Sequence, residues 1–161
     1  MLELENKIYK PYFITFEGGE NSGKTTQSKM LYEYLLSKGI KAIHTREPGG
    51  TPEAEKICDI VVNHNINQMT EFLLCMAARY EHLYNVIIPA LNNNQWVICD
   101  RFMDSTLCYQ GWDVDIDQWG FYDFIDIMPE ITFLMNIKPE ICILRIKNKD
   151  IKLFHIDILI V

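Results

Sequence analysis

The sequence predicts a three-layer α/β fold in which a parallel sheet of about five strands is flanked by helices. Short apolar segments rich in β-branched and aromatic residues alternate with segments whose apolar residues recur at helical spacing. The first strand, a glycine-rich loop, a helix and a second strand follow one another directly, which is the order of a βαβ unit with parallel strands. The chain has 161 residues, 48% hydrophobic and 23% charged, so we expect residues 1–161 to form a single domain.

Five short segments have the composition of buried strands, because each is an apolar run with β-branched or aromatic residues. The third segment, QWVICD, ends in Asp100. This pattern is typical of a central parallel strand that delivers a carboxylate to the ligand-binding edge of the sheet. The expected strands cover residues 12–17, 41–45, 95–100, 131–137 and 152–160.

Six segments are expected to be helical. Thr51 and Pro52 form an N-cap followed by a proline in the first helical position. Thr70 is expected to cap a long helix that is interrupted only near its end by Pro89, and Pro139 begins the last helix. The expected helices cover residues 24–37, 52–62, 70–91, 105–110, 117–126 and 139–147.

Charge and composition exclude several classes of protein. The net charge of −7 argues against a general binder of nucleic acids or anionic membranes, which needs a broad basic face. No segment has about 18 uncharged apolar residues, and acidic residues stand where a secretory signal would need a basic end, so we expect a cytoplasmic protein. The five cysteines include no C-x-x-C pair and the histidines lack metal-ligand spacing, so we expect reduced thiols and no zinc site.

Residues 18–25, GGENSGKT, match the phosphate-loop pattern G-x-x-x-x-G-K-[ST] between an expected strand and an expected helix. Glycines let the backbone curl so that its N–H groups face a polyphosphate, and the start of the helix adds partial positive charge. Lys24 is expected to hold the β- and γ-phosphates, and Thr25 to place its hydroxyl on Mg²⁺. Such a loop binds a nucleoside triphosphate but does not select a reaction.

Four further motifs make the pattern more specific. They are TREPGGT (45–51), MAAR (76–79), DRF (100–102) and STLCYQG (105–111). Together with the phosphate loop they occur in the order found in bacterial thymidylate kinases, and the chain resembles that family from about Tyr12 to Arg145. The resemblance implies a P-loop kinase fold, transfer of the γ-phosphate of ATP to dTMP with Mg²⁺, and a homodimer. It also implies that ATP is bound by Gly18, Gly19, Glu20, Asn21, Ser22, Gly23, Lys24, Thr25 and Thr26.

The resemblance further implies a catalytic set. Asp100 supports the Mg²⁺ and its waters, together with Thr25, and Arg101 holds the acceptor phosphate against the γ-phosphate. Two anions repel each other, and cations stabilise the charge on the transferred group. Glu20 matches the acid near the acceptor's 3′-hydroxyl, and Arg145 matches the position that leads into the lid. The implied catalytic residues are Lys24, Arg101, Asp100, Glu20 and Arg145.

On the acceptor side, Arg79 matches the arginine that donates to thymine O4, and Thr106 the polar position that reads the base edge. Tyr109 matches the aromatic residue under the sugar, which would exclude a 2′-hydroxyl. Arg46 either reaches the acceptor phosphate or only braces its loop. The residues implied to bind dTMP are Arg46, Phe72, Cys75, Arg79, Arg101, Thr106, Tyr109 and Gln110.

The chain departs from the family in two places. Cys75 stands where the family has a phenylalanine that stacks on thymine, so either Phe72 leans over the base or the stack is weaker by about 1 kcal/mol. The arginine-bearing lid expected after about residue 149 is also not visible. Either the protein is naturally short or segments of a longer protein are missing from the sequence, and an intact mass well above 18.9 kDa would indicate the second, which we favour.

Two other functions remain open on these residues. A deoxynucleoside kinase has a similar loop and Asp-Arg element, and it would phosphorylate thymidine itself. A non-catalytic ATP-binding protein without its lid would bind ATP but transfer no phosphate. The preference between dTMP and dUMP also stays open, because one methyl group is worth only about 1 to 3 kcal/mol.

Overall fold

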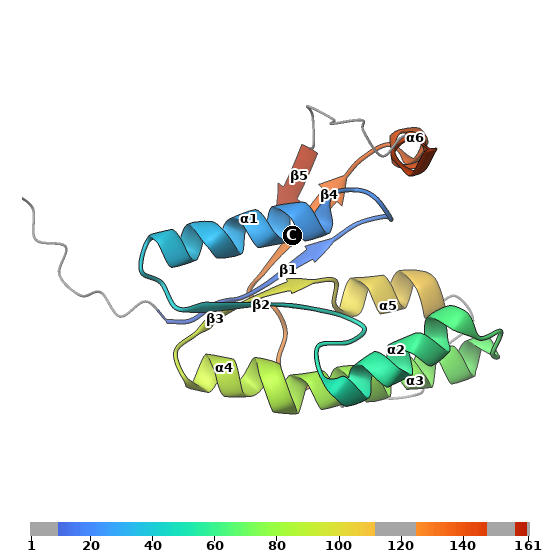
Figure 1. Ribbon diagram of the computed structural model, residues 1–161, viewed down its shortest axis with the longest axis horizontal. Coiled ribbons are helices and arrows are strands. Elements are labelled where there is room, and N and C mark those ends of the chain that lie inside the picture. Colours follow the sequence, from blue (N-terminus) through green and yellow to red (C-terminus); the bar gives the residue numbers. More distant parts are fainter. Residues whose placement is uncertain (1–9, 112–124, 148–156, 161) are drawn as a thin grey trace, which may run out of the picture.

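The computed structural model describes residues 10–111, 125–147 and 157–160. Its strands are β1 (Phe13–Glu17), β2 (Ala42–Arg46), β3 (Trp96–Asp100), β4 (Ile131–Asn136) and β5 (Asp157–Ile160). Its helices are α1 (Lys24–Ser37), α2 (Pro52–Asn63), α3 (Gln68–His82), α4 (Ile88–Asn92), α5 (Met103–Gln110) and α6 (Pro139–Lys147). Helix α1 lies on one side of the sheet and α2, α3 and α4 lie on the other (Figure 1). The predicted three-layer α/β fold is confirmed.

The sheet has the strand order β2-β3-β1-β4-β5. The first four strands of this order are parallel, and β5 pairs with β4 in the antiparallel direction. The register pairs Phe16 of β1 with Asp100 of β3, so the carboxyl ends of these two strands lie side by side. Ligands of open α/β sheets bind at such carboxyl ends, which is where the phosphate loop leaves β1.

Successive residues of the central strands face opposite helical layers. Phe13 of β1 and Val97 of β3 belong to one apolar cluster with side chains of α3 and α4. Ile14 and Ile98 belong to a second cluster with Leu35 of α1. Because these strands are buried on both faces, they appear in the sequence as continuous apolar runs.

Helix α3 begins before the predicted residue Thr70. The side chain of Asn67 accepts a hydrogen bond from Met69 N at 2.9 Å, so Asn67 is the N-cap and the helix begins at Gln68. An asparagine immediately before the helix satisfies a backbone N–H that would otherwise lack a partner. The prediction of a cap at Thr70 was therefore wrong, whereas the cap predicted at Thr51 is confirmed.

A π-helical turn (Leu83–Ile87) separates α3 from α4, and it was not predicted. There the N–H of Ile88 donates to Leu83 O, which is a longer loop than in an α-helix. Pro89 lies in the first turn of α4. A proline has no N–H to donate, and its ring would clash with the carbonyl four residues earlier, so the wider turn accommodates it without ending the helical segment.

Three other boundaries differ from the predictions. Helix α5 begins at Met103, two residues early. The helix expected over residues 117–126 lies mostly outside the described residues, and its last two residues, 125 and 126, are not helical. The strand expected over residues 152–160 is described only from Asp157. In the ranges described above, no helix is long and apolar enough to cross a membrane.

Candidate active site

The phosphate loop joins β1 to α1 and depends on glycines for its shape. Gly18 and Gly23 have φ values of +138° and +102°, a region that residues with a Cβ rarely adopt. A Cβ on Gly18 would also lie 2.9 Å from Met135 O, so the strand β4 backbone leaves no room for a side chain. No side chain of the described ranges caps the first turn of α1, which leaves its N–H groups available for an anion.

Lys24 is buried inside this loop. Its Nζ donates to Gly19 O at 2.7 Å and to Ser22 Oγ at 3.4 Å. Burial lowers the pKa of Lys24, and the positive charge of Arg101 lowers it further. The two cations therefore share one site, and an anionic ligand between them would relieve both the desolvation and the repulsion.

Thr25 and Asp100 meet where α1 begins and β3 ends. The Thr25 hydroxyl donates a hydrogen bond to Asp100 Oδ2. Asp100 is buried, and in the part of the chain that the structure describes its Oδ1 is the one buried side-chain oxygen without a hydrogen-bond partner. A hydroxyl and a carboxylate are the oxygen ligands that suit Mg²⁺, and an unpaired buried oxygen is costly without a cation or water, so these residues fit the expected metal.

Arg101 follows Asp100 directly and has a φ of +70°, in the left-handed region. Its N–H donates to Phe16 O at 2.9 Å, which holds the turn against β1. The guanidinium lies 5.3 Å from the centre of the Tyr109 ring, 3.7 Å from a carboxylate oxygen of Glu20, and 3.5 Å from Gly18 O. It therefore lies between the phosphate loop and helix α5.

The sequence patterns did not point to Glu17, the last residue of β1. Its two carboxylate oxygens accept hydrogen bonds from Phe102 N and from Ser105 Oγ, each at 2.6 Å. Burial raises the pKa of Glu17, although these two hydrogen bonds oppose the shift. The signal was present, because Glu17 ends an apolar strand in the same way as Asp100 does. Glu17 fixes the turn that carries Arg101.

A pocket of about 410 Å³ opens between the phosphate loop and helices α2, α3 and α5. We call it the arginine pocket, because it is lined by Arg46, Arg79 and Arg101. Seven of the eight residues predicted to bind dTMP line it, and Glu20 does as well. The seven are Arg46, Cys75, Arg79, Arg101, Thr106, Tyr109 and Gln110. Phe72 is the exception.

Arg79 is a buried cation at the base of this pocket. Its Nε donates to Glu47 Oε2 at 2.7 Å, and its Nη2 donates to Phe102 O at 2.9 Å and to Thr106 Oγ1 at 2.8 Å. Among the described residues, its Nη1 has only the thioether sulfurs of Met103 at 3.4 Å and of Met76 at 3.8 Å, which are weak acceptors. The guanidinium also lies over the Phe102 ring, 4.8 Å from its centre.

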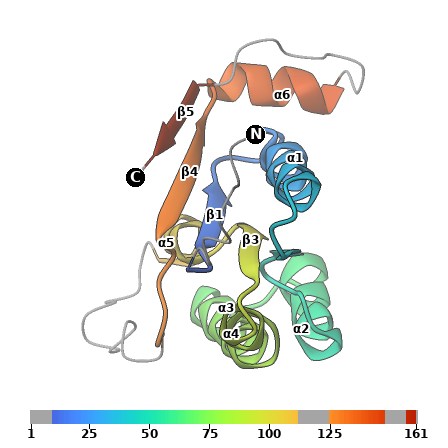
Figure 2. The same ribbon diagram turned by 90° about the vertical axis from the view of Figure 1, so that its left-hand side faces the viewer.

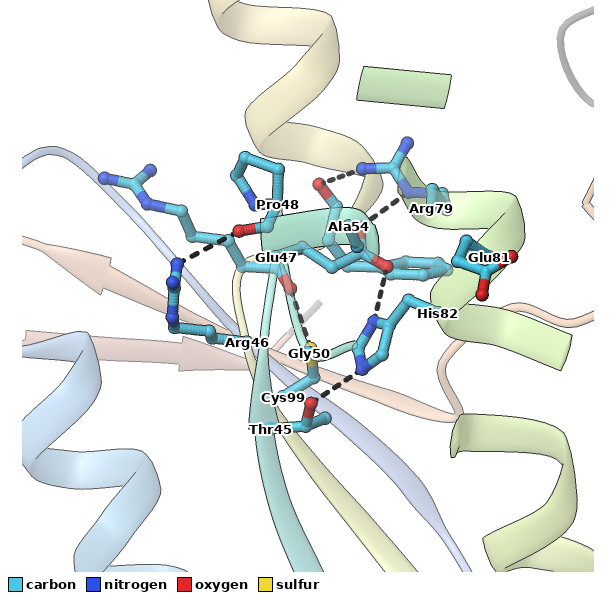
Figure 3. Close-up of polar contacts among 12 residues, drawn as sticks. Thr45, Arg46, Glu47, Pro48, Gly50, Ala54, Arg79, Glu81, His82 and Cys99 are labelled. Atoms are coloured by element: carbon cyan, nitrogen blue, oxygen red, sulfur yellow. Dashed lines mark hydrogen bonds and ion pairs between the residues drawn. The ribbon is translucent and has the colours of Figure 1, made fainter. Parts of the chain in front are cut away.

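Glu47 and His82 also belong to the site, and the sequence patterns did not single them out. Glu47 Oε1 lies 3.1 Å from His82 Nδ1, and His82 Nε2 lies 2.6 Å from Thr45 Oγ1 (Figure 3). Glu47 lies within the TREPGGT motif, which could have drawn attention to it. His82 lies one helical turn after Arg79 but outside any of the motifs.

Arg46 braces the loop that follows β2. Its Nη1 donates to Pro48 O at 3.0 Å and its Nη2 contacts the carboxylate of Glu55. The other oxygen of Glu55 accepts from Gly50 N at 3.0 Å. These contacts favour the bracing role for Arg46, although its side chain also lines the arginine pocket.

Phe72 and Cys75 lie on the same helix but face different surroundings. Phe72 is 2% exposed and packs in the apolar cluster that includes Phe13 and Leu83. Cys75 is a free thiol that lines the arginine pocket, and burial raises its pKa to about 11. These positions favour the weaker stack over a Phe72 that leans across the base.

Three other predicted residues lie around the edge of the site. Gln110 Nε2 donates to Glu71 Oε1 at 2.7 Å, which joins α5 to α3. Tyr109 is half exposed. Arg145 of α6 donates to Asn21 O in the phosphate loop at 2.7 Å. Figure 2 shows α6 next to the α1 end of the molecule, on the opposite side from α2 and α3.

The chain matches the family model described as Thymidylate kinase over residues 16–159. A thymidylate kinase of Orientia tsutsugamushi is 53% identical over 143 residues, which cover 86% of this chain and 66% of the relative. Thymidylate kinases of Rickettsia peacockii and Rickettsia typhi are each 47% identical over 150 residues, which cover 90% of this chain and 74% of each relative. The crystal structure of thymidylate kinase from Ehrlichia chaffeensis has a TM-score of 0.74 and 39% identity, and the match covers 87% of this chain and 84% of that one.

The chain therefore spans 66% of the length of the Orientia relative and 74% of the Rickettsia relatives. The family match nevertheless includes β2, β3 and β4 and both sides of the site. It begins at residue 16, just before the phosphate loop, and continues beyond Arg145. On the family model, the identities and the solved structure together, this chain belongs to the thymidylate kinase family.

Proposed function

We propose that this chain transfers the γ-phosphate of ATP to dTMP, giving dTDP and ADP for the synthesis of DNA precursors. The observation that carries the proposal is the position of Arg101, whose guanidinium lies between Gly18 of the phosphate loop and Tyr109 of the arginine pocket. A donor phosphate on the loop and an acceptor phosphate in the pocket would therefore meet at one cation. Positioning and charge stabilisation supply most of the catalysis in phosphoryl transfer.

On the donor side, residues 18–26 would bind the triphosphate of ATP. Lys24 would hold its β- and γ-phosphates, whose negative charge would offset the burial that lowers the pKa of this ammonium. Thr25 and Asp100 would hold Mg²⁺, with Asp100 acting through water. The ion, when bound, neutralises charge on the phosphate oxygens. Asp100 Oδ1 supports this role, because it is buried without a partner.

On the acceptor side, Arg79 would donate from Nη1 to O4 of thymine. That nitrogen has only sulfur acceptors in the described structure, so a carbonyl oxygen would be a better partner. Thr106 and Gln110 would contact the base edge, and Tyr109 would pack under the sugar. Glu20 would lie near the 3′-hydroxyl, because its carboxylate lies 3.7 Å from the Arg101 guanidinium that would hold the acceptor phosphate.

Arg145 would add a third cation on the donor side. Its hydrogen bond to Asn21 O brings a guanidinium to the phosphate loop, which contains no basic residue between Gly18 and Gly23. We place the reaction in the cytoplasm, where ATP and deoxynucleotides are available, and expect a homodimer as in the family it resembles.

The experiment is a panel of nucleoside monophosphates with ATP and Mg²⁺, followed by coupled release of ADP. We expect dTMP to stimulate ADP release more than dCMP, dAMP or dGMP does. The variant Arg101→Lys should reduce this stimulation by about 10³-fold, since an ammonium cannot reproduce the guanidinium fork. Lys29→Arg on the exposed face of α1 is the matched control. Turnover of thymidine but not dTMP would assign a deoxynucleoside kinase. ATP binding without transfer to any monophosphate would defeat the proposal.

A further inference from the structure

We infer that Glu47 and His82 are positioning residues, which hold the Arg79 guanidinium in the orientation that reads the base. The inference rests on the proposed function, because it takes Arg79 as the group that contacts O4 of thymine. It adds two residues that would set dTMP affinity and base selectivity without touching the nucleotide. Both act through hydrogen bonds in a connected series that starts at Thr45 and ends at Arg79 (Figure 3).

The series is continuous and almost entirely removed from solvent. Thr45 Oγ1 and His82 Nε2 are 2.6 Å apart, His82 Nδ1 and Glu47 Oε1 are 3.1 Å apart, and Arg79 Nε and Glu47 Oε2 are 2.7 Å apart. The exposed fractions of His82, Glu47 and Arg79 are 0%, 4% and 3%. Electrostatic interactions are stronger where water is excluded, so the geometry of this series is held more firmly than that of a surface pair.

The hydrogen-bond partners of Arg79 show which of its N–H donors the series leaves available for a ligand. A guanidinium has five N–H donors in a rigid plane. Glu47 takes the Nε donor, and Phe102 O and Thr106 Oγ1 take those of Nη2. Nη1 is left with thioether sulfurs. Since the fork is planar, fixing the Nε edge also fixes the direction in which Nη1 points.

Glu47 can hold that edge only while its carboxylate does not rotate. One oxygen is bound to Arg79 Nε, and His82 Nδ1 binds the other. A carboxylate accepts hydrogen bonds and does not donate them, so Nδ1 carries the proton in this arrangement. The Thr45 hydroxyl bonds to the remaining ring nitrogen. His82 thus fixes the rotation of Glu47, and Glu47 fixes Arg79.

The imidazole ring itself is held by the backbone of the TREPGGT loop. Gly50 has a φ of +90°, and a Cβ at this position would lie 2.5 Å from both Nε2 and Cδ2 of His82. The loop therefore passes directly against the edge of the ring. An imidazole in contact with backbone on that edge cannot turn to release Glu47 without moving the loop.

A merely structural role for these residues would affect all ligands alike, whereas a positioning role would not. O4 of thymine accepts a hydrogen bond, but cytosine has an amino group in its place, which cannot accept from Arg79. Loosening Arg79 should therefore weaken dTMP and leave dCMP nearly unchanged. ATP would bind at the phosphate loop, on the other side of Arg101, and its affinity should also be unaffected.

The experiment measures kcat and KM for dTMP and dCMP, and Kd for ATP, in the full chain and its variants. We expect His82→Leu to raise KM for dTMP about tenfold, with kcat changed less than threefold, and to lower the dTMP-to-dCMP ratio of kcat/KM by a similar factor. His82→Asn can place an amide donor near the position of Nδ1, so we expect it to recover most of the ratio. Glu47→Gln should show the largest loss, since one amide oxygen cannot accept from both Arg79 and His82. His64→Asn, at an exposed histidine, is the control.

Equal losses for dTMP and dCMP, or His82→Asn no better than His82→Leu, would overturn the inference and leave a structural role. If His82→Leu does not fold, Thr45→Val tests the same series by removing one hydroxyl, and an unchanged ratio in both Thr45→Val and Glu47→Gln would overturn it. The unmodified chain separates the two proposals. If it does not prefer dTMP to dCMP, the proposed function fails. If it does prefer dTMP and no variant changes the ratio, only the positioning role fails.

Discussion

The hydroxyl of Thr25 donates a hydrogen bond to Asp100 Oδ2, and this contact joins the first turn of α1 to the end of β3 across 75 residues of sequence. It follows from the parallel pairing of β1 with β3, which brings Asp100 next to the strand from which the phosphate loop departs. One oxygen of Asp100 is therefore engaged, and the other is buried without a partner among the residues that the structure describes. A single carboxylate is thus oriented before any cation binds.

Asp100→Asn should lower turnover with saturating ATP and dTMP by at least about 100-fold, which corresponds to about 2.7 kcal/mol of transition-state stabilisation. The amide keeps the size of the side chain but removes the charge that would support the metal in the proposed function. Turnover is measured over a series of Mg²⁺ concentrations, with Asp59→Asn on the exposed face of α2 as the control. A variant with the Mg²⁺ dependence of the unmodified chain would contradict the metal role of Asp100.

Lys24→Met should abolish transfer and yet stabilise the protein in the absence of nucleotide. Burial and the charge of Arg101 both disfavour the charged ammonium, and methionine has a similar length without the charge. A lysine whose pKa is lowered in the folded protein costs stability at pH 7, where the ammonium is charged in the unfolded chain, so we expect a modest rise in the free energy of unfolding. Urea unfolding of the nucleotide-free protein measures this, with Lys29→Met on the exposed face of α1 for comparison. A loss of stability in Lys24→Met alone would show that the ammonium is favourable there.

Cys75→Phe should tighten dTMP binding by about fivefold, or about 1 kcal/mol, because an aromatic ring on this wall of the arginine pocket can stack on the base. Calorimetric titration of dTMP measures the change. Leu73→Phe, at a position on α3 that is 47% exposed, controls for the added ring. An unchanged Kd for Cys75→Phe would mean that the cysteine costs the site nothing.

The stability contributed by Glu17 should decrease as the pH rises. Burial raises the pKa of Glu17 above its ordinary value of 4.5, so the folded protein binds this proton more tightly than the unfolded chain does. Its contribution is fully present below about pH 4.5 and is lost as the pH rises through the raised pKa of the folded state. Unfolding free energies of the unmodified chain and of Glu17→Gln are compared from pH 4 to pH 8. We expect the unmodified chain to lose stability relative to the variant as the pH rises over this range. The raised pKa would be contradicted if this stability difference stays constant, or if the unmodified chain gains stability relative to the variant.

The layers of the fold and the phosphate loop could be predicted from the sequence for physical reasons, whereas the residues that line the arginine pocket were implied by the resemblance to thymidylate kinases. Strands buried on both faces, such as β1 and β3, leave continuous apolar runs, and Gly18 and Gly23 mark a backbone that only glycine adopts readily. The N-cap of α3 is Asn67 and not the predicted Thr70; both residue types cap helices well, so the residue type alone does not identify the cap.

The buried ionic contacts of the site were harder to predict. Glu47 and His82 are 35 residues apart, and their pairing depends on how β2 and α3 pack rather than on local spacing. Phe72 was considered for the base site because it lies one turn before Cys75, but the helix turns its ring into the core. Spacing along a helix identifies neighbours on a surface, whereas the direction of each face depends on the layers around it.

The hydrogen bond from Arg145 to Asn21 O connects helix α6 to the phosphate loop. Helix α6 follows β4, which pairs with β1 on the side away from β3 and β2. A shift of α6 relative to the sheet would therefore reach the phosphate loop through this hydrogen bond, although no residue of that loop belongs to α6.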